Sequence, residues 1–350
     1  MLTPATLISN IQPLLTKFLS FVNVLIFNQA LHLYHTSKQK TMHTILGAGG
    51  PVANALTQEL IAHQQTIRLV SRRPVAIKAD NLIWQKADLL NHAQVLEATT
   101  GSTVIYLCAG LVYDADVWRE QWPVIIQNVI KATKAHNARL IFFDNVYMYG
   151  LVNGPMTEDT PYHPISEKGK VRAQIAETIM QEVKAGNLNA TIARAPDFYG
   201  TSSANAFLDM MVLAKYAKKE SAQWVGNPSK LHNFIYIPDA GKAMYLLGQY
   251  PESANQIWHL PTSPVMTGHQ FLELAALTYG VKPKFMRVPK FMLWLLGLFN
   301  KVIAGTVEMY YQTDHDYIFN SDKFEKAFNF KPTSYEDGIK EVARTIYKPE

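Results

Sequence analysis

The feature that most constrains the fold is a glycine-rich turn between a short apolar run and a helical stretch. Thr44–Ile45–Leu46 leads into Gly47, Ala48, Gly49 and Gly50, and a helical pattern follows Pro51, Val52 and Ala53. Glycine lets a backbone turn tightly and approach a phosphate without an intervening Cβ. The free N–H groups at a helix N-terminus attract anions. Strand, glycine turn and helix in this order are typical of dinucleotide-binding folds. We therefore predict a pyrophosphate site formed by Gly47, Gly49, Gly50, Pro51 and Val52.

Short apolar runs alternate with helical stretches over the next 150 residues. The runs read as buried parallel strands because they are continuously apolar, and strands that alternate with helices indicate a doubly wound sheet. We expect a Rossmann-type α/β core over residues 42–200. A smaller C-terminal α+β lobe over residues 201–350 should bind the substrate, with some chain returning to the core. The expected strands are 44–46, 67–70, 82–84, 103–108, 139–143 and 191–193.

Charge and cysteine content exclude several classes of function. The net charge is +5, and Lys17, Lys38 and Lys40 supply three of those charges in a leader without acidic residues. The remaining chain has no basic block, which argues against nucleic acid as a partner. A single cysteine, Cys108, excludes an intrachain disulfide and a multi-cysteine zinc site. The histidine spacing gives no convincing metal site, and we expect a cytoplasmic protein.

Residues 1–41 form a separate problem. The apolar run within residues 18–27 is about half the length that a membrane span needs, and neither a clear secretory signal nor an arginine-rich presequence is present. We expect Met42 to be the native start and residues 1–41 to be a dispensable extension. The alternatives are an interfacial helix or a targeting segment. Membrane contact is expected only if this extension belongs to the native protein.

The end of the second expected strand indicates which dinucleotide binds. Sites for NAD place a carboxylate there to bind the ribose hydroxyls. This chain instead has Ser71, Arg72 and Arg73. Guanidinium groups form strong charge-assisted hydrogen bonds with phosphate, so we favour NADP over NAD. The alternative is a pair of solvated surface arginines.

Several short motifs occur along the chain in a familiar order. They are Gly47–Ala53, the Asp88 turn, Cys108–Gly110, Tyr147–Gly150, Arg194–Gly200, Tyr236–Ala240, and Phe330–Pro332 with Gly338. Through these motifs the chain resembles, over residues 43–348, the NAD(P)-dependent epimerase/dehydratase family, the extended short-chain dehydrogenases/reductases. The resemblance implies that Asp88 and Leu89 contact adenine and that Cys108, Ala109 and Gly110 lie against the cofactor. It also implies that Ala195, Pro196 and Phe198 lie near the nicotinamide.

The catalytic positions depart from the family pattern. The family places a tyrosine and a lysine four residues apart on one helix, and a serine or threonine on the fifth strand. We align the lysine with Lys170, which would also hold the cofactor ribose. The tyrosine position then holds Ser166, and the strand position holds Asn145. A serine hydroxyl is a far weaker acid than a phenol, whose pKa is about 10.

Three interpretations of this altered site remain open. The acid–base role passes to Lys170, Asp144, Tyr147 or Tyr199, while Asn145 donates a hydrogen bond to the reacting oxygen. Alternatively, the protein binds NADP(H) without turnover and acts as a regulator or redox sensor. In the third interpretation the reaction uses the cofactor only structurally. Tyr162 is a weaker substitute for the missing tyrosine.

The favoured function is that of a reductase or epimerase acting on a small carbonyl or hydroxyl compound, and a nucleotide-sugar is one possible substrate class. The sequence leaves open whether the protein forms a homodimer. We expect His232 and Trp224 as candidates for lining the substrate pocket. Phe291–Phe299 is apolar apart from one glycine, and we expect a buried C-terminal helix there. The alternatives for that segment are a hydrophobic substrate pocket or contact with a lipid surface.

Overall fold

A seven-stranded parallel sheet organises the computed structural model, which describes residues 41–202 and 206–350. Its strand order is β11-β6-β5-β4-β1-β2-β3, and residues 42–350 form one unit. The order reverses between β1 and β4, which is where such sheets bind their ligands. The strands are β1 (Met42–Leu46), β2 (Thr66–Ser71), β3 (Leu82–Lys86), β4 (Val104–Leu107), β5 (Arg139–Asp144), β6 (Ala190–Arg194) and β11 (Ile257–His259).

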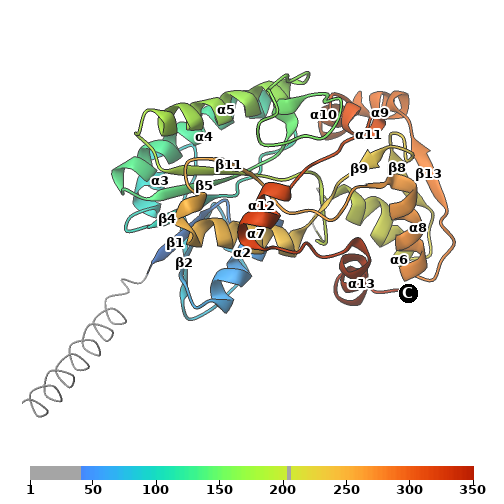
Figure 1. Ribbon diagram of the computed structural model, residues 1–350, viewed down its shortest axis with the longest axis horizontal. Helices are drawn as coiled ribbons and strands as arrows, with labels where there is room; N and C mark the ends of the chain where they lie inside the picture. Colours follow the sequence, from blue (N-terminus) through green and yellow to red (C-terminus); the bar gives the residue numbers. More distant parts are fainter. Residues whose placement is uncertain (1–40, 203–205) are drawn as a thin grey trace, which may run out of the picture. The chain divides into compact units, whose positions relative to one another are not determined.

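Helices cover both faces of this sheet (Figure 1). One face carries α3 (His92–Ala98), α4 (Ala115–Ala135) and α5 (Glu167–Lys184). The other carries α2 (Pro51–Ala62), α7 (Ile237–Gln249) and α12 (Asp322–Phe328). Because both faces are covered, strand residues such as Ile45, Ile105 and Ile192 are fully buried. The predicted doubly wound Rossmann-type fold is confirmed.

The second half of the chain contributes to two regions. Its α7, β11 and α12 complete the sheet layers, and most of the rest builds a lobe beyond the carboxyl ends of the strands (Figure 1). The lobe's helical elements are η2 (Asp209–Leu213), α6 (Ala214–Ala217), α8 (Gly268–Thr278), α9 (Lys290–Gly297), α10 (Lys301–Val307), α11 (Tyr311–Asp314) and α13 (Tyr335–Thr345). Its short strands are β7 (Phe198–Tyr199), β8 (Ala222–Val225), β9 (Leu231–His232), β10 (Ile235–Tyr236), β12 (Met266–Thr267) and β13 (Phe285–Val288). Two single turns, η1 (Tyr147–Tyr149) and η3 (Pro251–Ser253), complete the order.

One expectation about the lobe is wrong. The apolar character of Phe291–Phe299 predicts a buried helix, but Leu293 is the only buried residue of α9. Phe299 is 87% exposed and Phe291 is 68% exposed. Among the described residues, no helix combines the length and apolar character that a membrane crossing needs. The prediction for residues 1–41 falls almost wholly on residues 1–40, which lie outside the described residues.

Candidate active site

The turn between β1 and α2 has a backbone conformation that favours glycine. Gly47 and Gly49 have φ values of +84° and +98°, which side chains other than glycine rarely adopt. A Cβ at Gly47 would lie 2.4 Å from the Cα of Ala109. Gly50 precedes α2, and a Cβ there would meet no atom within 4 Å. The turn therefore packs closely on the chain after β4 and leaves open space at the start of α2.

A basic loop follows β2. The Ser71 hydroxyl donates to the carbonyl of Arg73 at 2.6 Å and accepts the indole N–H of Trp84 at 3.0 Å. These bonds hold the loop, while Arg72 and Arg73 are exposed and form no salt bridge within the described chain. Both guanidinium groups are therefore available to an anionic ligand.

The other predicted cofactor residues also follow the carboxyl ends of strands. After β3, the Asp88 carboxylate accepts the N–H of Leu90 at 3.0 Å, and the carbonyl of Leu89 accepts the Asn128 amide at 2.9 Å. After β4, Cys108 and Ala109 are half-buried and Gly110 is exposed. Burial raises the pKa of the Cys108 thiol to about 12, which argues against a nucleophilic role. After β6, Ala195 and Pro196 are buried and Phe198 is half-buried.

At the beginning of α5, Ser166 and Lys170 do not lie together at the site as the family pattern predicts. The Ser166 hydroxyl caps the helix by accepting the N–H of Gly169 at 3.0 Å. The Lys170 side chain is 60% exposed and pairs with Glu167 at 2.6 Å on the outer surface. Lys170 therefore points to solvent, whereas Ser166 is buried as the helix cap. The buried face instead presents Lys168 and Arg172, four residues apart, alongside Val171 and Ile175.

Lys168 joins the core to the lobe. Its fully buried ammonium group donates to the carbonyl of Gly305 at 2.9 Å, forms an ion pair with Glu308, and lies 4.3 Å from the ring centroid of Tyr113. A Cβ at Gly305 would lie 2.4 Å from the carbonyl oxygen of Tyr113, so α10 can approach this closely only with glycine there. Lys168 thus ties the lobe to the edge of the sheet.

Two tyrosines meet beside this lysine. The Tyr113 hydroxyl donates to the Tyr147 hydroxyl at 3.2 Å, and the Tyr147 ring stacks on Trp118. Burial raises the pKa of both phenols, and the nearby carboxylate of Asp197 raises both pKa values further. Both phenols therefore stay protonated at neutral pH.

Asn145 lies next to this phenol pair in the chain. Its side-chain oxygen accepts the N–H of Tyr147 at 3.1 Å. Within the described chain its amide N–H₂ group forms no hydrogen bond. The amide is therefore available to a ligand, and its catalytic role stays a prediction.

Asp144 lies behind the phenol pair with two arginines. Its carboxylate is fully buried, 3.3 Å from Arg172 and 3.7 Å from Arg194. Burial raises its pKa, and the two guanidinium groups oppose this effect. Arg172 lies 4.6 Å from the ring centroid of Trp118, and the Tyr147 ring stacks on Trp118. These contacts favour a supporting role for Asp144 over a role as general base.

Tyr199 lies away from this cluster, in the core of the lobe. It is 1% exposed and packs among Tyr236, Phe271 and Tyr335. A Cβ at Gly338 would lie 2.2 Å from its hydroxyl. The surroundings of Tyr199 favour packing, the alternative to a catalytic role. Tyr162 is also a structural residue, because its hydroxyl accepts a hydrogen bond from the Arg194 guanidinium group.

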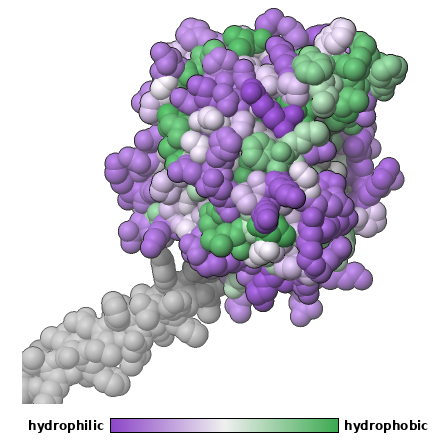
Figure 2. Space-filling view, turned by 90° about the vertical axis from the view of Figure 1, so that its right-hand side faces the viewer, coloured by the Kyte–Doolittle hydropathy of each residue, from purple (hydrophilic) through white to green (hydrophobic). Residues whose placement is uncertain are grey.

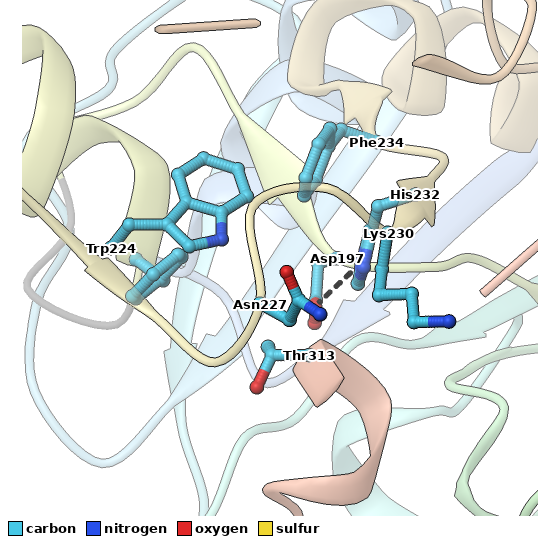
Figure 3. A pocket seen from close by; sticks show the side chains of 8 residues that line it. Asp197, Trp224, Asn227, Lys230, His232, Phe234 and Thr313 are labelled. Atoms are coloured by element: carbon cyan, nitrogen blue, oxygen red, sulfur yellow. Dashed lines mark hydrogen bonds and ion pairs between the residues drawn. The ribbon is translucent and has the colours of Figure 1, made fainter. Parts of the chain in front are cut away.

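A small pocket opens in the lobe next to Asp197 (Figure 3). His232 bonds Asp197 at 3.2 Å and is stacked between Phe234 and Tyr317, each with its ring centroid 4.4 Å away. Both predicted pocket residues, His232 and Trp224, line it; the remaining lining residues are Phe207, Asn227, Lys230, Phe234 and Thr313. Within the described ranges, no cluster of three metal-ligating side chains is present.

Sequence reasoning missed Lys168, Arg172, Tyr113, Asp197 and Glu308. One signal was available for the first two. They lie on the same helix face as Val171, Ile175, Ala176 and Ile179. Burying a cation on an apolar face is costly unless it is paired or hydrogen-bonded, so this pattern predicts polar partners for both residues. No local pattern marks Tyr113 or Glu308. Packing of the loop before α4 against α5 brings Tyr113 to Lys168, and the docking of α10 brings Glu308 there.

Comparison with known proteins places the chain in a family. The chain is 24% identical over 275 residues to dTDP-6-deoxy-L-talose 4-dehydrogenase (NAD(P)(+)) of Kitasatospora kifunensis, covering 73% of this chain and 84% of that protein. The fold matches UDP-glucose 4-epimerase of Thermus thermophilus in complex with NAD, with a TM-score of 0.70, 15% identity, and coverage of 87% and 100% of the two chains.

A second solved structure agrees. The dTDP-glucose 4,6-dehydratase of Bacillus anthracis, in complex with NAD, matches with a TM-score of 0.72 and 15% identity over 87% of this chain and 96% of that one. The model of the NAD dependent epimerase/dehydratase family matches residues 43–260. The glycine turn, the strand order and this match together show that the chain belongs to the NAD dependent epimerase/dehydratase family.

Proposed function

We propose that the protein is an NADP-dependent reductase of the epimerase/dehydratase type that acts on a carbonyl or hydroxyl group of a small molecule. The observation that carries the proposal is the partly buried pair of hydrogen-bonded phenols, Tyr113 and Tyr147, with the unpartnered amide of Asn145 beside Tyr147. A nucleotide-sugar is the substrate class that the names of the relatives support.

The strand ends offer a complete set of cofactor contacts. Gly47, Gly49 and Gly50 would hold the pyrophosphate, because the space at Gly50 is open. Arg72 and Arg73 would hold a 2′-phosphate, since both are exposed and unpaired within the described chain. Asp88 and Leu89 would border adenine, and Cys108–Gly110, Ala195, Pro196 and Phe198 would border the nicotinamide. A bound nicotinamide cofactor would supply or accept the hydride.

The phenol pair favours reduction over oxidation. A protonated phenol can donate to a carbonyl oxygen that gains negative charge, and an alkoxide is a much stronger base than a phenolate. Burial keeps Tyr113 and Tyr147 in this protonated state at neutral pH. The Asn145 amide would add a second, neutral hydrogen bond to the same oxygen.

Lys168 and Arg172 replace Ser166 and Lys170 in this proposal. They share the buried helix face, whereas Lys170 is exposed and Ser166 caps the helix. Lys168 would position Tyr113, and Arg172 would position Tyr147 through the Trp118 ring. We regard both as positioning residues.

The test of catalysis is to incubate the protein with NADPH and a panel of carbonyl compounds and nucleotide-sugars, following absorbance and products. Replacing both phenols, Tyr113→Phe with Tyr147→Phe, should lower kcat by roughly 10²–10⁴-fold and leave NADPH affinity unchanged. Tyr250→Phe, at a 44% exposed site, is the matched control. Full activity of the double variant would refute the phenol role.

The alternative is a non-catalytic NADP(H)-binding regulatory or redox-sensing protein. The observation that favours it is the absence of a tyrosine one turn before a buried helix lysine on α5. Tight NADPH binding with no turnover across the whole panel would support this alternative and reject the enzyme.

The test of cofactor choice is calorimetric titration with NADP and NAD. Arg72→Ala and Arg73→Ala should each weaken NADP binding by roughly tenfold to a hundredfold, because each removes a charge-assisted hydrogen bond. NAD affinity should not change. Equal affinities of the parent protein for NAD and NADP would contradict the proposed preference.

A further inference from the structure

The α9–α10 hairpin exposes a concentrated apolar surface that the proposed function does not use. Phe291, Trp294, Leu295 and Leu298 share one face of α9, with spacings of three and four residues. Each of seven large apolar residues within twelve positions is 45–87% exposed: Phe291, Trp294, Leu295, Leu296, Leu298, Phe299 and Val302. Figure 2 shows this surface as a green patch at the upper right. Large exposed apolar patches mark interaction sites.

The hairpin is held from its inner side, so its outer face is presented in one orientation. Leu293 packs with Val288 and Tyr310, and partly buried Ile303 and Val307 join them. A Cβ at Gly297 would lie 3.0 Å from the Cα of Ala304, which brings the two helices close together. The outer apolar face is therefore a stable feature of the fold.

The segment that carries the patch is basic, although Arg287 pairs with Asp314. Residues 274–307 contain no aspartate or glutamate but contain Arg287 and four lysines. The lysines are exposed and form no salt bridge within the described chain: Lys282, Lys284, Lys290 and Lys301. Lys290 and Lys301 directly flank the apolar face.

We propose that the α9–α10 hairpin docks on an anionic membrane surface. A short helix with tryptophan, phenylalanine and leucine on one face and lysines at its borders binds in the plane of the headgroups. The lysines add attraction to anionic lipid. A second copy of the chain fits less well, because a twofold interface would bring the same basic border against itself.

The experiment measures flotation of the full chain with vesicles of phosphatidylcholine that contain a minority of phosphatidylglycerol. The parent should bind these vesicles and bind pure phosphatidylcholine much more weakly. Leu298→Ser with Phe299→Ser should reduce partitioning at least about tenfold. Lys290→Glu with Lys301→Glu should reduce it by roughly 25-fold or more at low salt, about fivefold per lysine.

Matched controls separate this surface from the rest of the chain. Leu277→Ser changes a 78% exposed leucine on α8, and Lys131→Glu changes an exposed lysine on α4. Both should bind like the parent, and circular dichroism should show that every variant is folded. Brominated lipids should quench the tryptophan fluorescence of the parent more than that of Trp294→Phe.

Two results would overturn the proposal. Unchanged vesicle binding by both hairpin variants would assign any binding to another part of the chain, such as residues 1–41. Failure of the parent to bind vesicles, with hairpin variants that change the oligomeric state in sedimentation velocity, would assign the patch to a second copy.

Discussion

Replacing Gly47 by alanine tests whether the glycine turn is required by the fold itself. The new Cβ would lie 2.4 Å from the Cα of Ala109 and 2.6 Å from its nitrogen, so the backbone after β4 must move. Such overpacking costs about 1–3 kcal/mol. The φ of +84° adds about 1–2 kcal/mol for an L-residue. We expect a total loss of about 2–5 kcal/mol in the free energy of unfolding.

Gly101→Ala is the matched control. Gly101 has a similar φ of +72°, but a Cβ there would meet nothing within 4 Å. Its cost should therefore be the backbone strain alone, about 1–2 kcal/mol. The unfolding entropy of about 2.1 cal/mol/K per residue, over residues 42–350, converts 1 kcal/mol into a shift of roughly 1.5 °C.

Thermal unfolding followed by circular dichroism measures both variants. Gly47→Ala should lower Tm by roughly 3–8 °C and Gly101→Ala by roughly 1.5–3 °C. The difference between them measures the contact with Ala109. Equal shifts for the two variants would refute the argument that this contact, and not only the positive φ, requires glycine.

Two further predictions concern ligand approach and pH. Gly50→Ala should leave Tm unchanged or slightly higher, because φ is −76° and the space is open, yet weaken NADPH binding at least about tenfold in calorimetry; parent-like affinity would argue against close approach of the pyrophosphate. Burial lowers the pKa of His259 to about 3 and that of His43 to about 4. Stability should therefore fall as pH drops from about 6.5 to 4, since only the unfolded state takes up these protons, by about 1.4 kcal/mol per pH unit for each histidine. In urea titrations, His259→Gln should show a shallower pH slope than the parent, and an unchanged slope would contradict this assignment.

Local sequence pattern predicts that the proposed cofactor residues lie close together, but it does not predict the cluster around Lys168. Gly47, Arg72 and Asp88 each follow a strand, and strand ends of a parallel sheet meet at one edge. Their neighbourhood follows from chain order alone. Lys168, Tyr113 and Glu308 come from α5, the loop before α4, and the end of α10. Packing of that loop against α5 joins the first two, and packing of the lobe adds Glu308.

The sequence by itself determined the doubly wound sheet and the position of the glycine turn, because both depend on local backbone conformation and on continuous apolar strands. It also placed Asn145 at the end of β5. Only the tertiary structure decided which face of α5 meets the sheet edge, so that Lys168 and Arg172 are buried while Lys170 is exposed. The tertiary structure also left the apolar stretch Phe291–Phe299 largely exposed. Apolar side chains favour burial, but they are buried only where another part of the fold packs against them.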